Sequence, residues 1–141
     1  MNRLMVAAAV LAAATVTACA SDTATVSEAV FERGGELYQA NCASCHGADL
    51  AGAADWKTPK DDGSYPPPPH DSSGHTWHHP DRVLIEIIRD GSDFPQSRMP
   101  PFGDRLADED IEAILEFIKT SWGPLERAYQ DQATEQDQAE P

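Results

Sequence analysis

A five-residue segment, Cys42-Ala43-Ser44-Cys45-His46, constrains the fold of this chain more than any other feature. Its spacing lets two thiols each form a thioether bond with a vinyl group of one haem, while the imidazole that follows reaches the iron. A chain that binds haem in this way must fold around a large and mostly apolar disc. The segment therefore predicts one covalently bound haem c, attached at Cys42 and Cys45, with His46 as an iron ligand.

Two other uses of paired cysteines fit the surrounding sequence less well. A thioredoxin-like redox pair follows a strand and opens a helix, whereas here a predicted helix precedes the pair and Gly47 opens a loop. A zinc site needs four ligands, and the sequence contains no cysteine after Cys45. Haem attachment is the interpretation that the context favours.

Apolar residues recur at helical spacing in three segments. They predict helices over about residues 28–41, over about residues 80–89, and from Asp108 to Trp122, where Gly123-Pro124 stops the last one. Between the first two helices lies a loop from Gly47 to Trp77 that is rich in Gly, Pro, Asp and Ser and has no strand period. A chain with so long a loop and so few helices buries too little apolar surface for a stable hydrophobic core, and a large apolar cofactor would complete that core.

The beginning of the chain predicts export. A short positive start, Met1-Asn2-Arg3, precedes an apolar run over residues 4–16 that is too short to span a membrane. The run ends in Val16-Thr17-Ala18-Cys19, which resembles the lipobox of bacterial lipoproteins. We expect residues 1–18 to be a signal peptide, Cys19 to carry a lipid anchor at the periplasmic face of a membrane, and residues 19–27 to form a flexible tether. Cleavage at a nearby Ala-x-Ala-like site is the alternative.

Acidic residues outnumber basic ones by 24 to 10, which gives a formal net charge of -14. This charge argues against nucleic acid or an anionic lipid surface as a partner and allows steering toward a basic surface. Residues 125–141 are rich in Gln, Glu and Asp with hardly an apolar residue. They predict a disordered acidic tail.

The stretch Gly34-x-x-Leu37-Tyr38-x-x-x-Cys42-x-x-Cys45-His46-Gly47 resembles the N-terminal signature of class I cytochromes c. Met99-Pro100-Pro101-Phe102 and the helix ending in Phe117-Ile118-Lys119 resemble the methionine loop and the last helix of that family. The resemblance covers about residues 28–124. It implies an all-α class I cytochrome c fold, with three principal helices and long loops around one haem.

The resemblance also implies that Met99 is the second iron ligand. Met1 and Met5 would leave with the signal peptide, so Met99 is the one thioether that remains in the predicted domain. In the family, a glycine of the first helix meets an aromatic residue of the last, which here are Gly34 and Phe117, with Tyr38 on the same face. A proline carbonyl after the motif often accepts the N–H of the ligating imidazole, and Pro59 is the candidate. Ala107 stands where a capping serine is usual.

A ten-residue stretch of the proline-rich loop, residues 70–79, contains four further histidines: His70, His75, His78 and His79. They could form a second metal site, for copper or zinc, or provide an iron ligand in place of Met99. We prefer the interpretation that this loop covers one haem edge, with Trp77 or one histidine bonded to a haem propionate and the other rings in solvent. Pro80 and the prolines at 66–69 stiffen the loop, so convergence of four imidazoles is not assured.

Iron with His and Met ligands has no open position, and methionine ligation raises its reduction potential. We therefore expect a monomeric electron carrier, not an enzyme, that exchanges electrons with a redox protein donor and acceptor. Two alternatives stay open. One is an enzyme or sensor in which a labile Met99 exposes the iron, and the other is a copper-handling or accessory redox protein that uses the histidines at 70–79.

Overall fold

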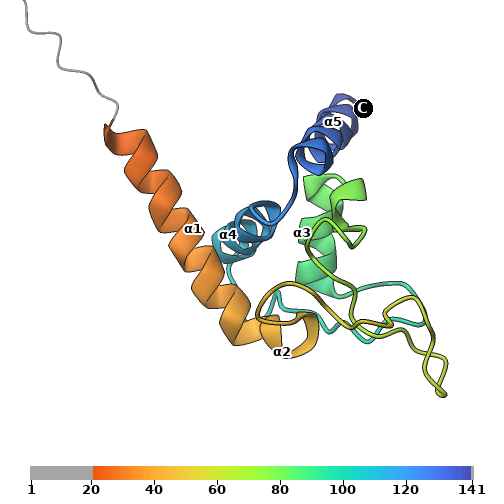
Figure 1. Cartoon of the computed structure of the whole chain (residues 1–141). Helices are drawn as coiled ribbons and strands as arrows, with labels where there is room; N and C mark the ends of the chain where they lie inside the picture. Colours follow the sequence, from red (N-terminus) through yellow and green to blue (C-terminus); the bar gives the residue numbers. More distant parts are fainter. Residues whose placement is uncertain (1–20, 141) are drawn as a thin grey trace, which may run out of the picture.

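The computed structural model describes residues 21–140, with side chains from Glu28 onward. The predicted signal peptide and Cys19 lie outside the described residues. Residues 21–140 contain no strand, and the predicted all-α fold is confirmed. None of the helices in this range is long and apolar enough to cross a membrane. The elements in chain order (Figure 1) are α1 (Ser21–Asn41), α2 (Ala43–His46), the 3-10 helix η1 (Thr76–His78), α3 (Asp81–Asp90), α4 (Asp108–Lys119) and α5 (Pro124–Ala139).

The three predicted helices correspond to α1, α3 and α4, with different ends. α1 begins at Ser21, so most of the segment predicted as a flexible tether is helical. Extending a helix that is already nucleated costs little, which explains why a segment without an apolar period can join it. Ala107, which stands where a capping serine is usual, is the N-cap residue of α4, and Pro80 is the N-cap of α3 and not its first helical residue.

α1 and α4 cross at Gly34. A Cβ atom at this position would overlap the carbonyl oxygen of Ala113, and the Cβ of Phe117 lies 3.0 Å from the same point. The Phe117 ring also contacts Tyr38, with the two ring centroids 5.4 Å apart. The predicted contact of Gly34 with Phe117 is confirmed, and its reason is the close approach of two backbones.

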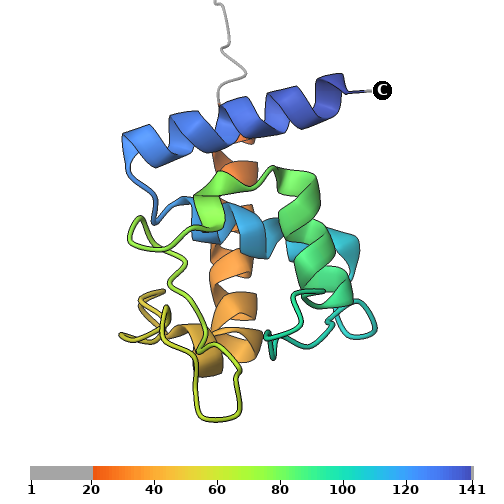
Figure 2. The same ribbon diagram turned by 90° about the vertical axis from the view of Figure 1, so that its right-hand side faces the viewer.

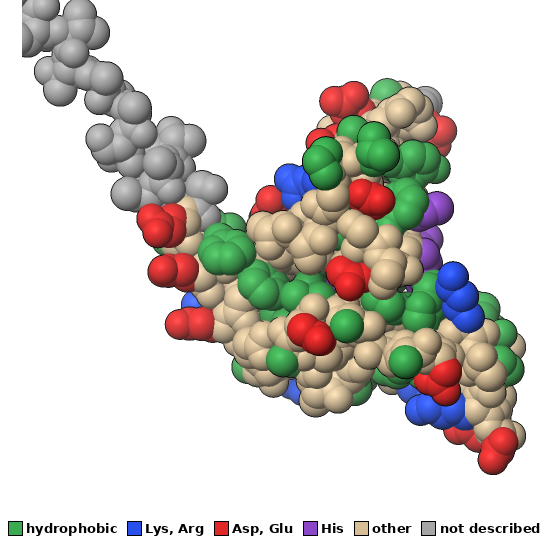
Figure 3. Space-filling view, in the orientation of Figure 1, with side chains coloured by type: hydrophobic (Ala, Val, Ile, Leu, Met, Phe, Trp, Pro, Cys, Tyr) green, Lys and Arg blue, Asp and Glu red, His purple; other side chains and the backbone are tan. Residues whose placement is uncertain are grey.

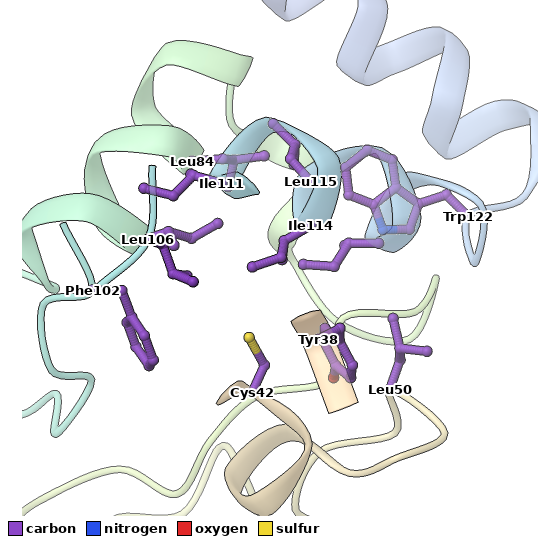
Figure 4. Packing of buried hydrophobic residues seen from close by; sticks show 12 residues of the cluster. Tyr38, Cys42, Leu50, Leu84, Phe102, Leu106, Ile111, Ile114, Leu115 and Trp122 are labelled. Carbon is purple, nitrogen blue, oxygen red and sulfur yellow. The ribbon is translucent and has the colours of Figure 1, made fainter. Parts of the chain in front are cut away.

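The hydrophobic core lies where α1, α3, α4 and the loops around them meet (Figure 4). α4 contributes more buried residues to it than any other helix, because its apolar residues share one face. The fully or nearly fully buried members are Tyr38, Ile111, Ile114, Leu115 and Ile118. Cys42 and Phe102 are buried at the edge of the same cluster, so the motif and the methionine loop border one core.

The predicted disordered tail is wrong, because residues 124–139 form the helix α5. This helix lies across η1 and the start of α3 (Figure 2). Its central contact is polar: Gln130 is 0 % exposed and donates to Asp81 and to the Thr134 hydroxyl. A search for apolar periodicity cannot detect a helix that docks through an amide and hydroxyl groups.

Candidate haem-attachment site

The cysteine motif follows α1 directly and forms one helical turn. The N–H groups of His46 and Gly47 donate to the carbonyl oxygens of Cys42 and Ala43, at 2.9 and 3.0 Å. Positions three and four apart lie on the same side of such a turn, so Cys45 and His46 share a side with Cys42. Cys42 is buried beside the core (Figure 4), and Cys45 is exposed.

Burial raises the pKa of the Cys42 thiol to about 11, and the neighbouring Cys45 adds to the shift. Cys42 is therefore a neutral thiol at neutral pH. The reactive cysteine of a thioredoxin-like pair has the opposite property, a lowered pKa. This difference agrees with the sequence context in disfavouring a disulfide-exchange site.

The His46 side chain is held by a carbonyl group from a distant part of the loop. Its Nδ1–H donates to the Pro68 carbonyl oxygen at 2.9 Å, which leaves Nε2 as the ring nitrogen available to a metal. Burial lowers the pKa of His46, so its imidazole is neutral and able to coordinate. The prediction that Pro59 supplies this carbonyl is wrong.

Pro68 reaches His46 because the loop doubles back on itself. Ala53 N–H donates to the Pro67 carbonyl at 2.9 Å, and His70 N–H donates to the Leu50 carbonyl at 2.8 Å. Gly52, at φ 60°, lies so close to Pro68 that a Cβ atom would meet the Pro68 backbone. The pairing of residues 50–53 with 67–70 therefore determines which proline carbonyl accepts the hydrogen bond from His46. In the sequence, the run Pro66 to Pro69 was the one sign that this part of the loop is special.

Met99 lies half-buried in the loop between α3 and α4, where it packs against the core. Its backbone N–H donates to the Ser97 hydroxyl at 3.1 Å. Gly91, at φ 82°, ends α3 close to the carbonyl of Met99. Next in the chain, the N–H groups of Phe102 and Gly103 donate to the carbonyl of Arg89, so the loop is fixed to the end of α3.

The four histidines of the proline-rich loop do not converge. The His70 ring stacks on His46 with centroids 3.9 Å apart, and His75 stacks on Trp56 at 5.3 Å. His75 and His79 are neighbours at 5.7 Å, whereas His78 lies against Trp77. Within residues 28–140, no group of three His, Cys, Asp or Glu side chains is placed to hold a metal ion. That no tight copper or zinc site exists stays a prediction, which calorimetric titration tests.

The buried polar atoms of the loop fit a haem group. Among the described residues, three buried side-chain atoms have no hydrogen-bond partner: His70 Nδ1, Trp77 Nε1 and Gln130 Oε1. The first two belong to the loop that follows Pro68, and an indole N–H can only donate. A haem offers carboxylates that accept such bonds, while its ring faces suit the apolar side chains beside Cys42 and Met99. The residues present therefore fit the group that the motif predicts.

Comparison with known proteins agrees with this site. Residues 29–118 match the model of the family described as cytochrome C oxidase, cbb3-type, subunit III. The matched range contains the cysteine motif, Pro68, the loop of residues 70–79 with its four histidines (the histidine loop), and Met99. No curated protein and no solved structure matches the chain. The chain therefore belongs to this family of c-type cytochromes, whose domain carries covalently bound haem c.

Proposed function

We propose that this protein is a single-haem electron carrier in which His46 and Met99 are the two iron ligands. Domains of its family serve as electron carriers or as redox subunits. The observation that carries the proposal is the hydrogen bond from His46 Nδ1 to Pro68, which directs the second ring nitrogen away from the loop backbone. Bound haem supplies the exchange of one electron at its iron.

Four residues of this chain would hold that group. Cys42 and Cys45 provide the covalent attachment, and His46 is neutral and held in one orientation by Pro68. Met99 is the thioether of the matched domain and borders the same apolar cluster as Cys42. With His46 and Met99 both bound, the iron would have no open position, which supports electron transfer and not catalysis on a bound substrate.

Replacing Met99 by Ala tests the ligation. The variant is expected to keep its covalent haem, to lose the far-red absorption band of sulfur-ligated ferric haem, and to bind carbon monoxide when reduced. Its reduction potential falls, because methionine ligation raises it. Arg98→Ala is the matched control, since this neighbouring side chain is exposed. Equal carbon monoxide binding by the native protein and the Met99 variant rejects Met99 as a ligand.

We also propose that the carrier works outside the cytoplasm, anchored by a lipid at Cys19. The motif supports this, because haem is attached to c-type cytochromes outside the cytoplasm. The supporting sequence feature is the lipobox-like end of the apolar run, Val16 to Cys19. A Cys19→Ser variant is expected to appear in the soluble fraction or to remain unprocessed. Membrane association of a processed Ser variant would contradict lipid anchoring.

A further inference from the structure

α5 lies beyond the residues that match the family model, and yet it binds the loop next to the haem site. The contacts begin just before the helix. The Trp122 indole N–H donates to the His70 carbonyl at 2.8 Å, and Gly123 N–H donates to the Ser72 hydroxyl at 2.8 Å. The C-terminal segment is therefore joined to the beginning of the histidine loop before α5 itself starts.

The middle of α5 holds the other end of the loop. The Tyr129 ring meets Trp77 edge to face, with centroids 5.6 Å apart and planes at 87°, and it also contacts His78 at 5.4 Å. Figure 3 shows histidine side chains on the surface next to α5. Trp77 therefore contacts both the core cluster and the Tyr129 ring.

The polar contacts of α5 fix its position along the loop. Gln130 donates to Asp81, and the Asp81 backbone N–H donates to the Thr134 hydroxyl at 3.1 Å. Asp81 also accepts from Lys119, which is 7 % exposed on the side chain, at 2.7 Å. Buried hydrogen-bonded groups allow few alternative arrangements, so this network sets which residue of α5 faces Trp77.

Trp77 is the residue of the loop that this arrangement places against the core. Its ring packs on the core cluster, and within residues 28–140 its Nε1–H has no partner. A buried indole N–H needs an acceptor, and a carboxylate of bound haem would supply one. Such a bond would withdraw negative charge from the carboxylate and so raise the reduction potential of the iron.

We propose that α5 is a clamp on residues 70–79, the loop beside the predicted haem site, and that Tyr129 is its positioning residue, acting through Trp77. The proposal rests on the haem of the proposed function but not on the identity of the second iron ligand. Without the Tyr129 ring, water reaches the outer face of Trp77 and the indole loses its fixed position. The reduction potential falls as the hydrogen bond weakens. Detachment of the whole helix would instead remove the acidic charge of α5 from the haem site, which would raise the reduction potential. The sign of the change in potential therefore distinguishes loss of the Tyr129 contact from detachment of α5.

The test is a double-mutant cycle on the full haem-loaded chain, with the midpoint potential as the readout. Tyr129→Ala is expected to lower the potential, and Tyr129→Phe to retain it. Leu125→Ala is the matched control on the same helix, since Leu125 is 82 % exposed and Tyr129 is 51 % exposed. Trp77→Phe removes the N–H and is expected to lower the potential. Adding Tyr129→Ala to Trp77→Phe should then change nothing further.

Three results would overturn the proposal: a Tyr129→Ala potential equal to that of Leu125→Ala, an unchanged potential in Trp77→Phe, or additive effects in the double variant. The far-red sulfur band of the unmodified protein tests Met99 ligation separately. A failure of the clamp and a failure of the proposed ligation therefore give different results.

Discussion

α1 and α4 can cross closely at Gly34 because this residue has no side chain. In Gly34→Ala the new methyl group overlaps the Ala113 carbonyl, so the helices must separate. We expect a loss of about 2 kcal/mol in the free energy of unfolding, the typical cost of overpacking, despite the better helix propensity of alanine.

Gly35→Ala is the control for this prediction, because its Cβ would meet only the edge of the Phe117 ring, at 3.2 Å. That ring can shift, so the expected change is within about 1 kcal/mol. Denaturant unfolding of the haem-loaded proteins provides the measurement. Equal stability of the two variants would show that the crossing tolerates a methyl group at Gly34.

Two histidines outside the attachment site are expected to make the stability of the protein depend on pH. Partial burial, with the charge of neighbouring histidines and, for His75, of Lys57, lowers the pKa of both His75 and His79 from the ordinary value of 6.5. Below pH 6.5 the unfolded chain takes up protons that the folded chain does not, so the free energy of unfolding decreases as the pH falls. The decrease continues until the pH passes the lowered pKa values.

The variant His75→Gln/His79→Gln is expected to show a shallower decrease than the native protein between pH 6.5 and the ordinary carboxyl pKa of 3.8. Denaturant unfolding across this range measures it, with both proteins compared also at pH 7.5. Parallel curves for the two proteins would contradict the assignment to these rings.

Among the helices, α3 depends on α5 for the cap of its first turn. Its N-cap residue is Pro80, which has no side chain able to accept from a helix N–H, and the Thr134 hydroxyl accepts from Asp81 N–H instead. Thr134→Ala is expected to cost about 1 kcal/mol of stability, as removal of a local N-cap does. Thr134→Ser keeps the hydroxyl and should unfold like the native protein. If the Thr134→Ala variant is as stable as the serine variant, the Thr134 hydroxyl does not cap α3.

At the scale of the whole molecule, the charge is large and negative. The formal net charge is -14, and acidic side chains occupy the first turn of α4. Figure 3 shows further acidic side chains over α1 and α5. Small redox reagents sense this charge over about 10 Å at moderate salt. We expect oxidation by the ferricyanide anion to accelerate as ionic strength rises, and oxidation by the tris(phenanthroline)cobalt(III) cation to slow. Stopped-flow kinetics gives both rates, and salt effects of the same sign would show that net charge does not govern the encounter.

The sequence by itself determined the family, the cofactor and the three main helices. These depend on local spacing: Cys42, Cys45 and His46 lie within one turn, and the apolar residues of each helix repeat along its own length. The resemblance also located Gly34 against Phe117, because the first and last helices of the domain cross in a conserved way in the family it resembles.

Only the tertiary structure decided what depends on segments distant in the sequence. The pairing of residues 50–53 with 67–70 brings Pro68, and not Pro59, to His46, and the bent loop does not bring the four histidines together at one point. α5 was missed because Gln130 and Thr134 dock it through polar bonds to Asp81, which leave no apolar pattern to detect. Hydrogen bonds between distant residues are satisfied only after the chain has folded, so composition and periodicity carry no record of them.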